Sequence, residues 1–97
     1  MTPSSLARLH VTVDGLVQGV GFRAFVVDQA QSLGLNGWVR NRWDGKVEAL
    51  AEGERQVLEK FLALLRRGPR SAHVSELTFE WQDALGTLDG FFVRRTE

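Results

Sequence analysis

Residues 15–23 combine three glycines with a following arginine, a spacing that suits the binding of an anion. The segment reads Gly-Leu-Val-Gln-Gly-Val-Gly-Phe-Arg, with a strand pattern before it and a helix pattern after it. Glycines allow the backbone to turn so that successive N–H groups point to one side. A helix N-terminus adds partial positive charge, and the guanidinium of Arg23 offers paired donors that match phosphate oxygens. We therefore expect this loop and Arg23 to hold a phosphate group.

Other glycine-rich sites fit these residues less well. Gly19, Gly21 and Ala24 match the G-x-G-x-x-G/A fingerprint of dinucleotide-binding folds. Those folds need repeated parallel βαβ units, whereas Asp44-Gly45 predicts an antiparallel hairpin. A P-loop is excluded because no Gly-Lys-Ser/Thr sequence follows the glycines. The alternative that needs no ligand is a tight turn followed by a solvated Arg23.

The residue six positions before Arg23 bears on the kind of chemistry. Enzymes that form a phosphocysteine have their cysteine at that position, and here it is Val17, which carries no nucleophile. Catalysis at this loop would require water to attack phosphorus directly, with the protein supplying positioning and charge neutralisation. Such a site gives little help to the leaving group. We therefore expect a substrate whose leaving group is already good, such as the carboxylate of a mixed acyl–phosphate anhydride.

Asn41 is the candidate for orienting the attacking water. In the strand predicted over residues 35–42 it shares a face with Val39, so its amide should point into a semi-buried layer. An amide can orient a water through its carbonyl oxygen and its NH₂ group, but the proton must go elsewhere, for example to a substrate phosphate oxygen. The alternative is that Asn41 is a turn residue preceding Asp44-Gly45.

Composition narrows the class of protein. The 97 residues are enough for one domain, and 12 basic residues balance 12 acidic ones, so no electrostatic footprint for nucleic acid or an anionic membrane is expected. The chain has no cysteine, which excludes disulfides, thiolate metal sites and thiol nucleophiles. His10 and His73 lie far apart, so we expect no metal site. No apolar run is long enough to span a membrane and no signal peptide is recognisable, so we expect a cytoplasmic protein.

Hydrophobic periodicity predicts the order strand, helix, strand, strand, helix, strand. This order predicts an α+β fold, a split βαβ sandwich (βαββαβ) with two helices on one face of a mostly antiparallel sheet. Residues 1–97 form a single domain in this interpretation, with residues 1–7 as a loose lead-in. The elements are predicted near residues 9–13, 22–33, 35–42, 46–52 (ending at Gly53), 57–65 and 77–81, with a short final strand over 91–94.

Side chains on the remaining strand faces are predicted to do no chemistry. We expect Glu48 and Glu52 on an exposed strand face, and Arg40 and Arg42 solvated, with Arg42 near the mouth of the site. The three tryptophans are expected to be buried or half-buried; they are Trp38, Trp43 and Trp81.

Two segments resemble the two signatures of the acylphosphatase family. They are Gly15-x-Val17-Gln18-Gly19-Val20-Gly21-Phe22-Arg23 and Gly37-Trp38-Val39-Arg40-Asn41. The likeness runs from about Leu9 to Arg95, with further matches at Asp44-Gly45, Val47-Glu48, Ala51-Glu52-Gly53, Gly68-Pro69 with Ala72-x-Val74, and Phe91-x-Val93-Arg94. The resemblance implies a ferredoxin-like sandwich, hydrolysis of acyl phosphates to a carboxylate and phosphate, and no metal or organic cofactor.

The resemblance also implies roles for particular residues. Asn41 positions the attacking water, and Arg23 binds the phosphate together with the loop amides of Gln18, Gly19, Val20, Gly21 and Phe22. The chain departs from the family pattern at Leu16, where a basic residue is frequent, and at Arg42 and Trp43, where small or polar residues are frequent.

The expected partner is a small-molecule acyl phosphate, with acetyl phosphate, carbamoyl phosphate and 1,3-bisphosphoglycerate as candidates. We expect a monomer that binds neither nucleic acid nor a membrane. The alternative function is a non-catalytic or accessory module that binds acyl or carbamoyl phosphate, since this fold also occurs within larger proteins. The absence of a linker or a second domain favours a free-standing enzyme. A ferredoxin-like RNA-binding domain would need a basic surface and paired strand aromatics, which are missing.

Overall fold

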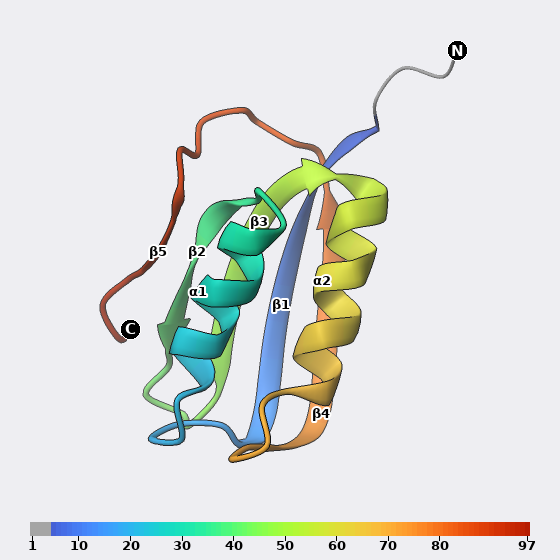
Figure 1. The fold of residues 1–97 in the computed structure, drawn as a ribbon. Coiled ribbons are helices and arrows are strands. Elements are labelled where there is room, and N and C mark those ends of the chain that lie inside the picture. The colour runs from blue at the N-terminus through green and yellow to red at the C-terminus, as the bar shows by residue number, and fades with distance from the viewer. Residues whose placement is uncertain (1–4) are drawn as a thin grey trace.

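The computed structural model describes residues 5–97, which fold into two helices packed on one face of a twisted sheet (Figure 1). The strand order is β4-β1-β3-β2-β5; neighbouring strands are antiparallel, except that β5 runs parallel to β2. This arrangement confirms the predicted α+β sandwich. The elements are β1 (Leu6–Leu16), α1 (Phe22–Ser32), β2 (Asn36–Asn41), β3 (Val47–Glu54), α2 (Arg55–Arg67), β4 (His73–Gln82) and β5 (Phe91–Val93).

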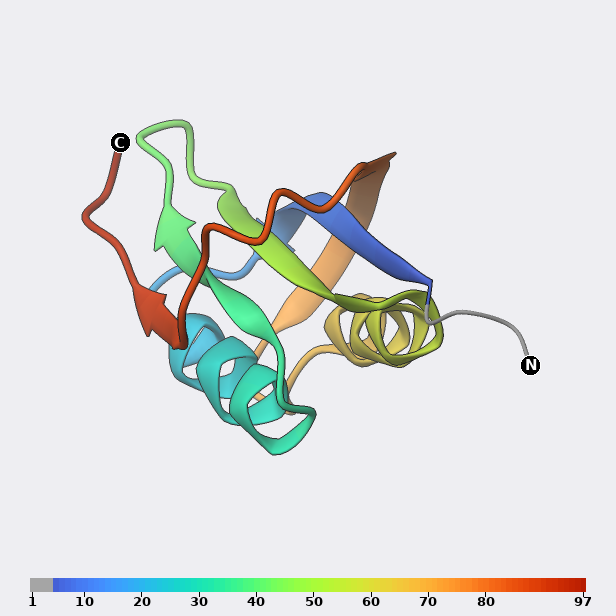
Figure 2. The same ribbon diagram turned by 90° about the horizontal axis from the view of Figure 1, so that it is seen from above.

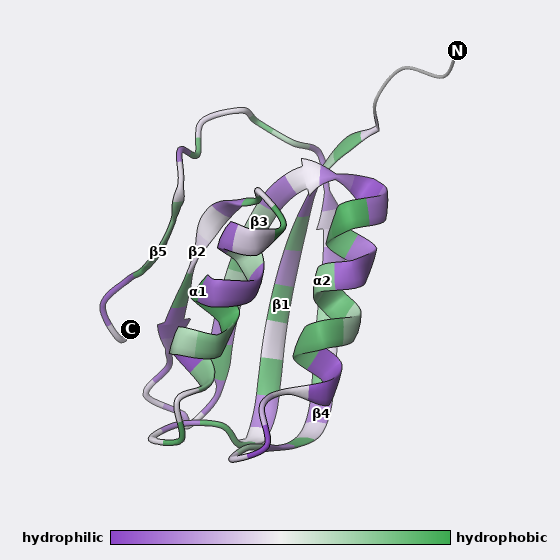
Figure 3. Cartoon of the chain, viewed as in Figure 1, coloured by the Kyte–Doolittle hydropathy of each residue, from purple (hydrophilic) through white to green (hydrophobic). Residues whose placement is uncertain are grey.

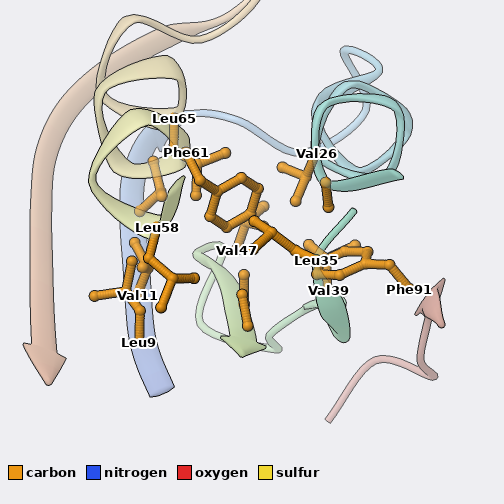
Figure 4. Close-up of a cluster of buried hydrophobic side chains, with 14 of the residues drawn as sticks. Leu9, Val11, Val26, Leu35, Val39, Val47, Leu58, Phe61, Leu65 and Phe91 are labelled. Carbon is orange, nitrogen blue, oxygen red and sulfur yellow. The ribbon is translucent and has the colours of Figure 1, made fainter. Parts of the chain in front are cut away.

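The core lies between the helices and the sheet. Alternate residues of β1 face the helices because strand side chains point to opposite faces in turn, and Leu9, Val11 and Val13 are fully buried as predicted. Hydrophobic and hydrophilic residues alternate along both helices (Figure 3), and the buried ones are Phe22, Val26 and Ala30 of α1 and Leu58, Phe61 and Leu65 of α2. From α2, Phe61 reaches across to Phe91 of β5, and the rings meet edge to face with centroids 6.0 Å apart (Figure 4). The short edge strand is therefore anchored in the core.

The N-terminal lead-in is shorter than predicted. Leu6 and Ala7 already belong to β1, Ala7 is buried, and the Ser5 carbonyl accepts a hydrogen bond from the Arg55 N–H at 2.8 Å. The ladder with β3 supplies these residues with partners, which local sequence patterns do not reveal. Residues 1–4 of the predicted lead-in lie outside the described residues. At the same end of the ladder, where Leu6 pairs with Glu54, β3 continues one residue past its predicted end at Gly53.

The expectation that Glu48 and Glu52 are exposed is wrong. They are only 8% and 6% exposed, although they point away from the helices. The segment between β4 and β5 crosses that face of the sheet because these strands form its two opposite edges (Figure 2). Glu52 accepts hydrogen bonds from the N–H groups of Leu85 and Gly86 and from Arg8 Nε, at 2.7–3.1 Å. The carboxylate thus fastens the crossing segment to the sheet.

Glu48 is the centre of a second polar cluster on the same face. It hydrogen-bonds to His10 Nε2 at 2.6 Å and to Arg40 Nε at 2.8 Å, and Arg40 also contacts Glu97. Arg40 is therefore half-buried and paired, which corrects the prediction that it is solvated. Burial alone raises the pKa of Glu48, but the hydrogen bonds with His10 and Arg40 outweigh it, so the pKa lies below its ordinary value.

The three tryptophans differ in how far they are buried. Trp38 is 8% exposed, and the guanidinium carbons of Arg40 and Arg94 lie 4.7 and 4.8 Å from the centroid of its ring. Trp81 is half-buried beneath Arg55. Trp43 is 83% exposed, which overturns the prediction that it packs against the protein. It lies in the turn between β2 and β3, where no element covers it.

Candidate active site

The chain leaves β1 through a bulge and enters α1 through a glycine loop, which we define as residues 17–22. The register of β1 against β4 shifts between Asp14 and Gly15, where φ is +131°. A Cβ atom at position 15 would lie 2.1 Å from the carbonyl oxygen of His73, so only glycine allows the strands to approach this closely. The bulge turns the chain towards the start of α1.

The glycine loop ends at the first turn of α1. Gly19 and Gly21 have φ values of +74° and +81°, the left-handed conformation that glycine adopts without strain. Gly21 precedes the first helical residue, Phe22, and its carbonyl accepts the N–H of Phe25. The N–H groups of Phe22, Arg23 and Ala24 have no acceptor within the helix, and no acidic residue lies in the first turn. The end of α1 therefore presents free donors and partial positive charge.

A cavity of about 340 Å³ opens over this loop and brings both predicted catalytic residues together. Arg23 enters it from the first turn of α1, and Asn41 from the end of β2. Arg23 is half-buried and forms no ion pair within residues 5–97, so its guanidinium is available to a ligand. The lining residues are Val17, Gly19, Gly21, Phe22, Arg23, Ala24, Asn41 and Val93.

Asn41, which lines this cavity, has a side-chain acceptor without a partner. Its Oδ1 atom is buried and is the one such side-chain atom without a hydrogen-bond partner in the part of the chain that the structure describes. A buried polar atom left unpaired costs free energy, so its native partner is expected to be a water or a ligand. An amide held this way can accept a hydrogen bond from a water in the cavity and orient its oxygen.

The backbone of Asn41 is fixed from both sides. Asn41 pairs with Val47 of β3, and its carbonyl oxygen accepts the N–H of Glu97 at 3.2 Å. It is therefore a strand residue, and the turn begins at Arg42, whose N–H donates to the Lys46 carbonyl. Val39 lies in the core and Asn41 lines the cavity beside α1, so their shared face is the semi-buried one that was predicted.

Two of the predicted loop residues, Gln18 and Val20, are absent from the cavity lining. Gln18 uses its side chain elsewhere: Nε2 donates to the carbonyl oxygens of Arg42 and Lys46, at 2.7 and 2.8 Å. The Val20 carbonyl accepts a hydrogen bond from Ser71 Oγ at 2.6 Å. Gly19, Gly21 and Phe22, by contrast, line the cavity with Arg23.

Sequence reasoning missed the contacts made by Gln18, Ser71 and Val93. The Gln18 side chain and Ser71 bond only to backbone carbonyls, and residue type does not reveal such partners. Val93 did carry a signal, since it lies in a segment that resembles the family pattern, but its place beside the cavity depends on the parallel pairing of β5 with β2.

The three positions that depart from the family pattern lie outside the cavity lining. Leu16 and Trp43 are 59% and 83% exposed. Arg42 pairs with Asp44 at 3.0 Å and does not line the cavity.

Across residues 5–97 no group of three or more histidine, aspartate or glutamate side chains is placed to hold a metal ion. None of the helices in this range has the length and apolar character needed to cross a membrane.

Known proteins share both the sequence and the fold. The family model described as Acylphosphatase matches residues 9–93. An acylphosphatase of Pelotomaculum thermopropionicum is 51% identical over 87 residues, which cover 90% of this chain and 95% of the relative. The crystal structure of acylphosphatase from Bacillus subtilis superposes with a TM-score of 0.87 at 38% identity, covering 91% of this chain and 98% of that one. An acylphosphatase from Coxiella burnetii gives a TM-score of 0.86 at 40% identity, over 97% and 100% of the two chains. The chain therefore belongs to the acylphosphatase family.

Proposed function

We propose that this protein is an acylphosphate phosphohydrolase, which cleaves the carboxyl–phosphate bond of small acyl phosphates by direct attack of water. One observation carries the proposal: Asn41, whose Oδ1 is buried without a hydrogen-bond partner, and Arg23, which forms no ion pair within residues 5–97, line the same cavity. The first can orient a water and the second can bind a phosphate, so the two reactants can be held side by side. The family membership of the chain supports the same reaction.

The phosphate is expected to lie over the glycine loop. Backbone N–H groups of residues 18–22 and the N-terminus of α1 surround its oxygens, and Arg23 donates from its planar fork. These donors neutralise charge that spreads over the equatorial oxygens as the phosphoryl group is transferred. In our proposal the glycine loop and Arg23 bind the phosphate and neutralise its charge without an organic cofactor or a metal ion.

The reaction needs one water and no covalent intermediate. Asn41 holds the water in line with the bond to be broken, its oxygen forms a bond to phosphorus, and the P–O bond to the acyl group breaks. The leaving group is a carboxylate, which is stable without a proton. The proton of the water passes to a phosphate oxygen, because an amide cannot take it. The products are a carboxylate and inorganic phosphate.

We further propose that the protein works as a cytoplasmic monomer on free small molecules. The described residues offer a single small cavity at the loop, which is of a size to hold a phosphate with a short acyl group. The balanced charge of 12 basic and 12 acidic residues supports a substrate that is neither a nucleic acid nor a membrane lipid.

Hydrolysis of benzoyl phosphate by the purified protein in excess chelator tests this function, with Asn41→Ala beside it. We expect chelator-resistant turnover in the wild type and its loss in the variant. Asn36→Ala is a matched control, because that amide binds the Gly90 N–H at the other end of β2. Phosphate binding by the wild type without turnover would instead identify a binding module and would overturn the proposal.

A further inference from the structure

Ser71 contacts the glycine loop from outside the cavity. It lies between α2 and β4, in a turn closed by a hydrogen bond from the Ala72 N–H to the Pro69 carbonyl at 3.0 Å. From this turn its hydroxyl donates to the carbonyl oxygen of Val20 at 2.6 Å. The two loops lie next to each other at the same end of the molecule (Figure 1). Ser71 itself is not among the residues that line the cavity.

The hydrogen bond from Ser71 to the Val20 carbonyl also determines the direction in which the Gly21 N–H points. In a trans peptide the carbonyl of one residue and the N–H of the next point to opposite sides, and the described residues contain no cis peptide. Because the Val20 carbonyl points at Ser71, the N–H of Gly21 points away from Ser71. Gly21 lines the cavity. The bond is thus placed to direct the Gly21 N–H towards a bound anion.

This peptide needs an external constraint because of its neighbours. Glycine permits left- and right-handed φ values at similar cost, so rotation of the Val20–Gly21 peptide meets little steric resistance at position 21, where φ is +81°. An added Cβ there would touch nothing within 4 Å, so no other segment packs against Gly21 on that side. The Val20 side chain packs against the core and fixes one side of the peptide. The hydroxyl of Ser71 supplies the missing constraint on the carbonyl.

We propose that Ser71 is a positioning residue for the anion site, which holds the Val20–Gly21 peptide with its N–H towards the phosphate. The inference rests on the proposed function, since it takes the ligand over the glycine loop to be a phosphate. Loss of a hydrogen bond of this kind shifts an equilibrium by roughly two- to tenfold. Ser71→Ala therefore weakens phosphate binding by that factor, while Ser71→Thr, which keeps the hydroxyl, restores it.

A titration with inorganic phosphate tests the proposal without relying on turnover. The Gly21 amide resonance is followed in ¹⁵N-labelled wild type, Ser71→Ala and Ser71→Thr, with Ser32→Ala as control because Ser32 is an exposed hydroxyl at the far end of α1. We expect the Kd for phosphate to rise roughly two- to tenfold in Ser71→Ala alone, with a smaller shift of the Gly21 amide at saturation. The melting temperature should fall by no more than a few degrees, because the bond is exposed.

Kinetics with benzoyl phosphate separate positioning from a general loss of structure. We expect the KM of Ser71→Ala to rise by the same factor as its phosphate Kd, with a smaller change in kcat. A wild-type Kd in Ser71→Ala overturns the proposal, as does a raised Kd that accompanies a larger fall in melting temperature and is not rescued by threonine. A wild type that binds phosphate at Gly21 but does not hydrolyse benzoyl phosphate overturns the proposed enzymatic function and leaves the role of Ser71 standing.

Discussion

Gln18 Nε2 donates a hydrogen bond to the carbonyl oxygen of Arg42 at 2.7 Å, and so joins the glycine loop to the residue that follows Asn41. The same NH₂ group bonds to the Lys46 carbonyl at 2.8 Å, on the other side of the turn. The loop that is proposed to bind phosphate and the strand that is proposed to orient water are thus tied by one side chain. Their separation sets the distance between the phosphorus atom and the attacking oxygen.

Replacing Gln18 by methionine should lower kcat/KM about tenfold to a hundredfold. Methionine keeps the length of the side chain but cannot donate, so the loop and the hairpin lose their tie, and a misplacement of about 1 Å costs up to roughly 100-fold in rate. Steady-state kinetics with benzoyl phosphate measure the effect. Gln56→Met, on the exposed side of α2, is the control. Equal kcat/KM values for the two variants would show that the tie has no catalytic consequence.

Replacing Arg23 and replacing Asn41 by alanine should affect phosphate affinity and turnover differently. Arg23→Ala removes the guanidinium from the cavity, so both phosphate affinity and turnover should be lost, with kcat/KM falling by about 1000-fold or more. Asn41→Ala should lower kcat by at least about 100-fold, with little effect on the inhibition constant of inorganic phosphate, because the amide contacts the water rather than the anion. The two inhibition constants measured side by side provide the check. A comparable loss of phosphate affinity in both variants contradicts this division of roles.

The sequence was sufficient to predict the elements that bring Arg23 and Asn41 together. Regular periodicity predicts the two helices, and Asp44-Gly45 predicts the hairpin, because these signals are local. The face occupied by Asn41 follows from the alternation of a strand once Val39 is assigned to the core. The predicted order of elements then leaves few topologies, and the structure has the expected one.

What could not be predicted depends on contacts between distant segments. Glu52 is buried because the segment after β4 crosses the sheet, and nothing near Glu52 in the sequence signals that Leu85 and Gly86 will cover it. Arg40 is a charged strand residue, a type that is usually assigned to the solvent. It is half-buried because it forms hydrogen bonds to Glu48 and Glu97. Sequence-based prediction assigns charged residues to the surface by default. It therefore systematically misses those that are buried in ion pairs.

Glu52→Gln should destabilise the fold by about 2–3 kcal/mol. The variant leaves Arg8 without its anion and sets an NH₂ group against the N–H donors of Leu85 or Gly86. For a domain of this size the loss corresponds to a fall in melting temperature of roughly 10 °C or more. Thermal unfolding followed by circular dichroism measures it. The control is Glu54→Gln, an exposed carboxylate two residues along the chain, and a shift no larger than in that variant would show that the cluster is not stabilising.

The stability of the protein should fall in acid, in part through Glu48. Its pKa is lowered in the folded protein, so the carboxylate contributes stability above the unfolded pKa of about 4.3, and this contribution is lost as the pH falls through the folded value. Glu48→Gln removes this group's contribution to the slope, which is at most about 1.4 kcal/mol per pH unit. Urea unfolding between about pH 6 and pH 3 gives the slope. The slope should be shallower in the variant, and an unchanged slope would mean that Glu48 has the same pKa in the folded and unfolded chains.

Val93 should influence which acyl group the cavity prefers. It is 48% exposed and lines the cavity with Ala24 and Asn41, so an apolar acyl group that extends from the phosphate can bury surface against it. At about 25 cal/mol per Å² of apolar contact, loss of some 30–40 Å² in Val93→Ser should raise the KM for benzoyl phosphate about three- to fivefold. The KM for acetyl phosphate should change less, because a methyl group offers little surface. Phe92→Ser, on the same strand but outside the cavity lining, is the control. Equal changes in KM for the two substrates would place the acyl group away from Val93.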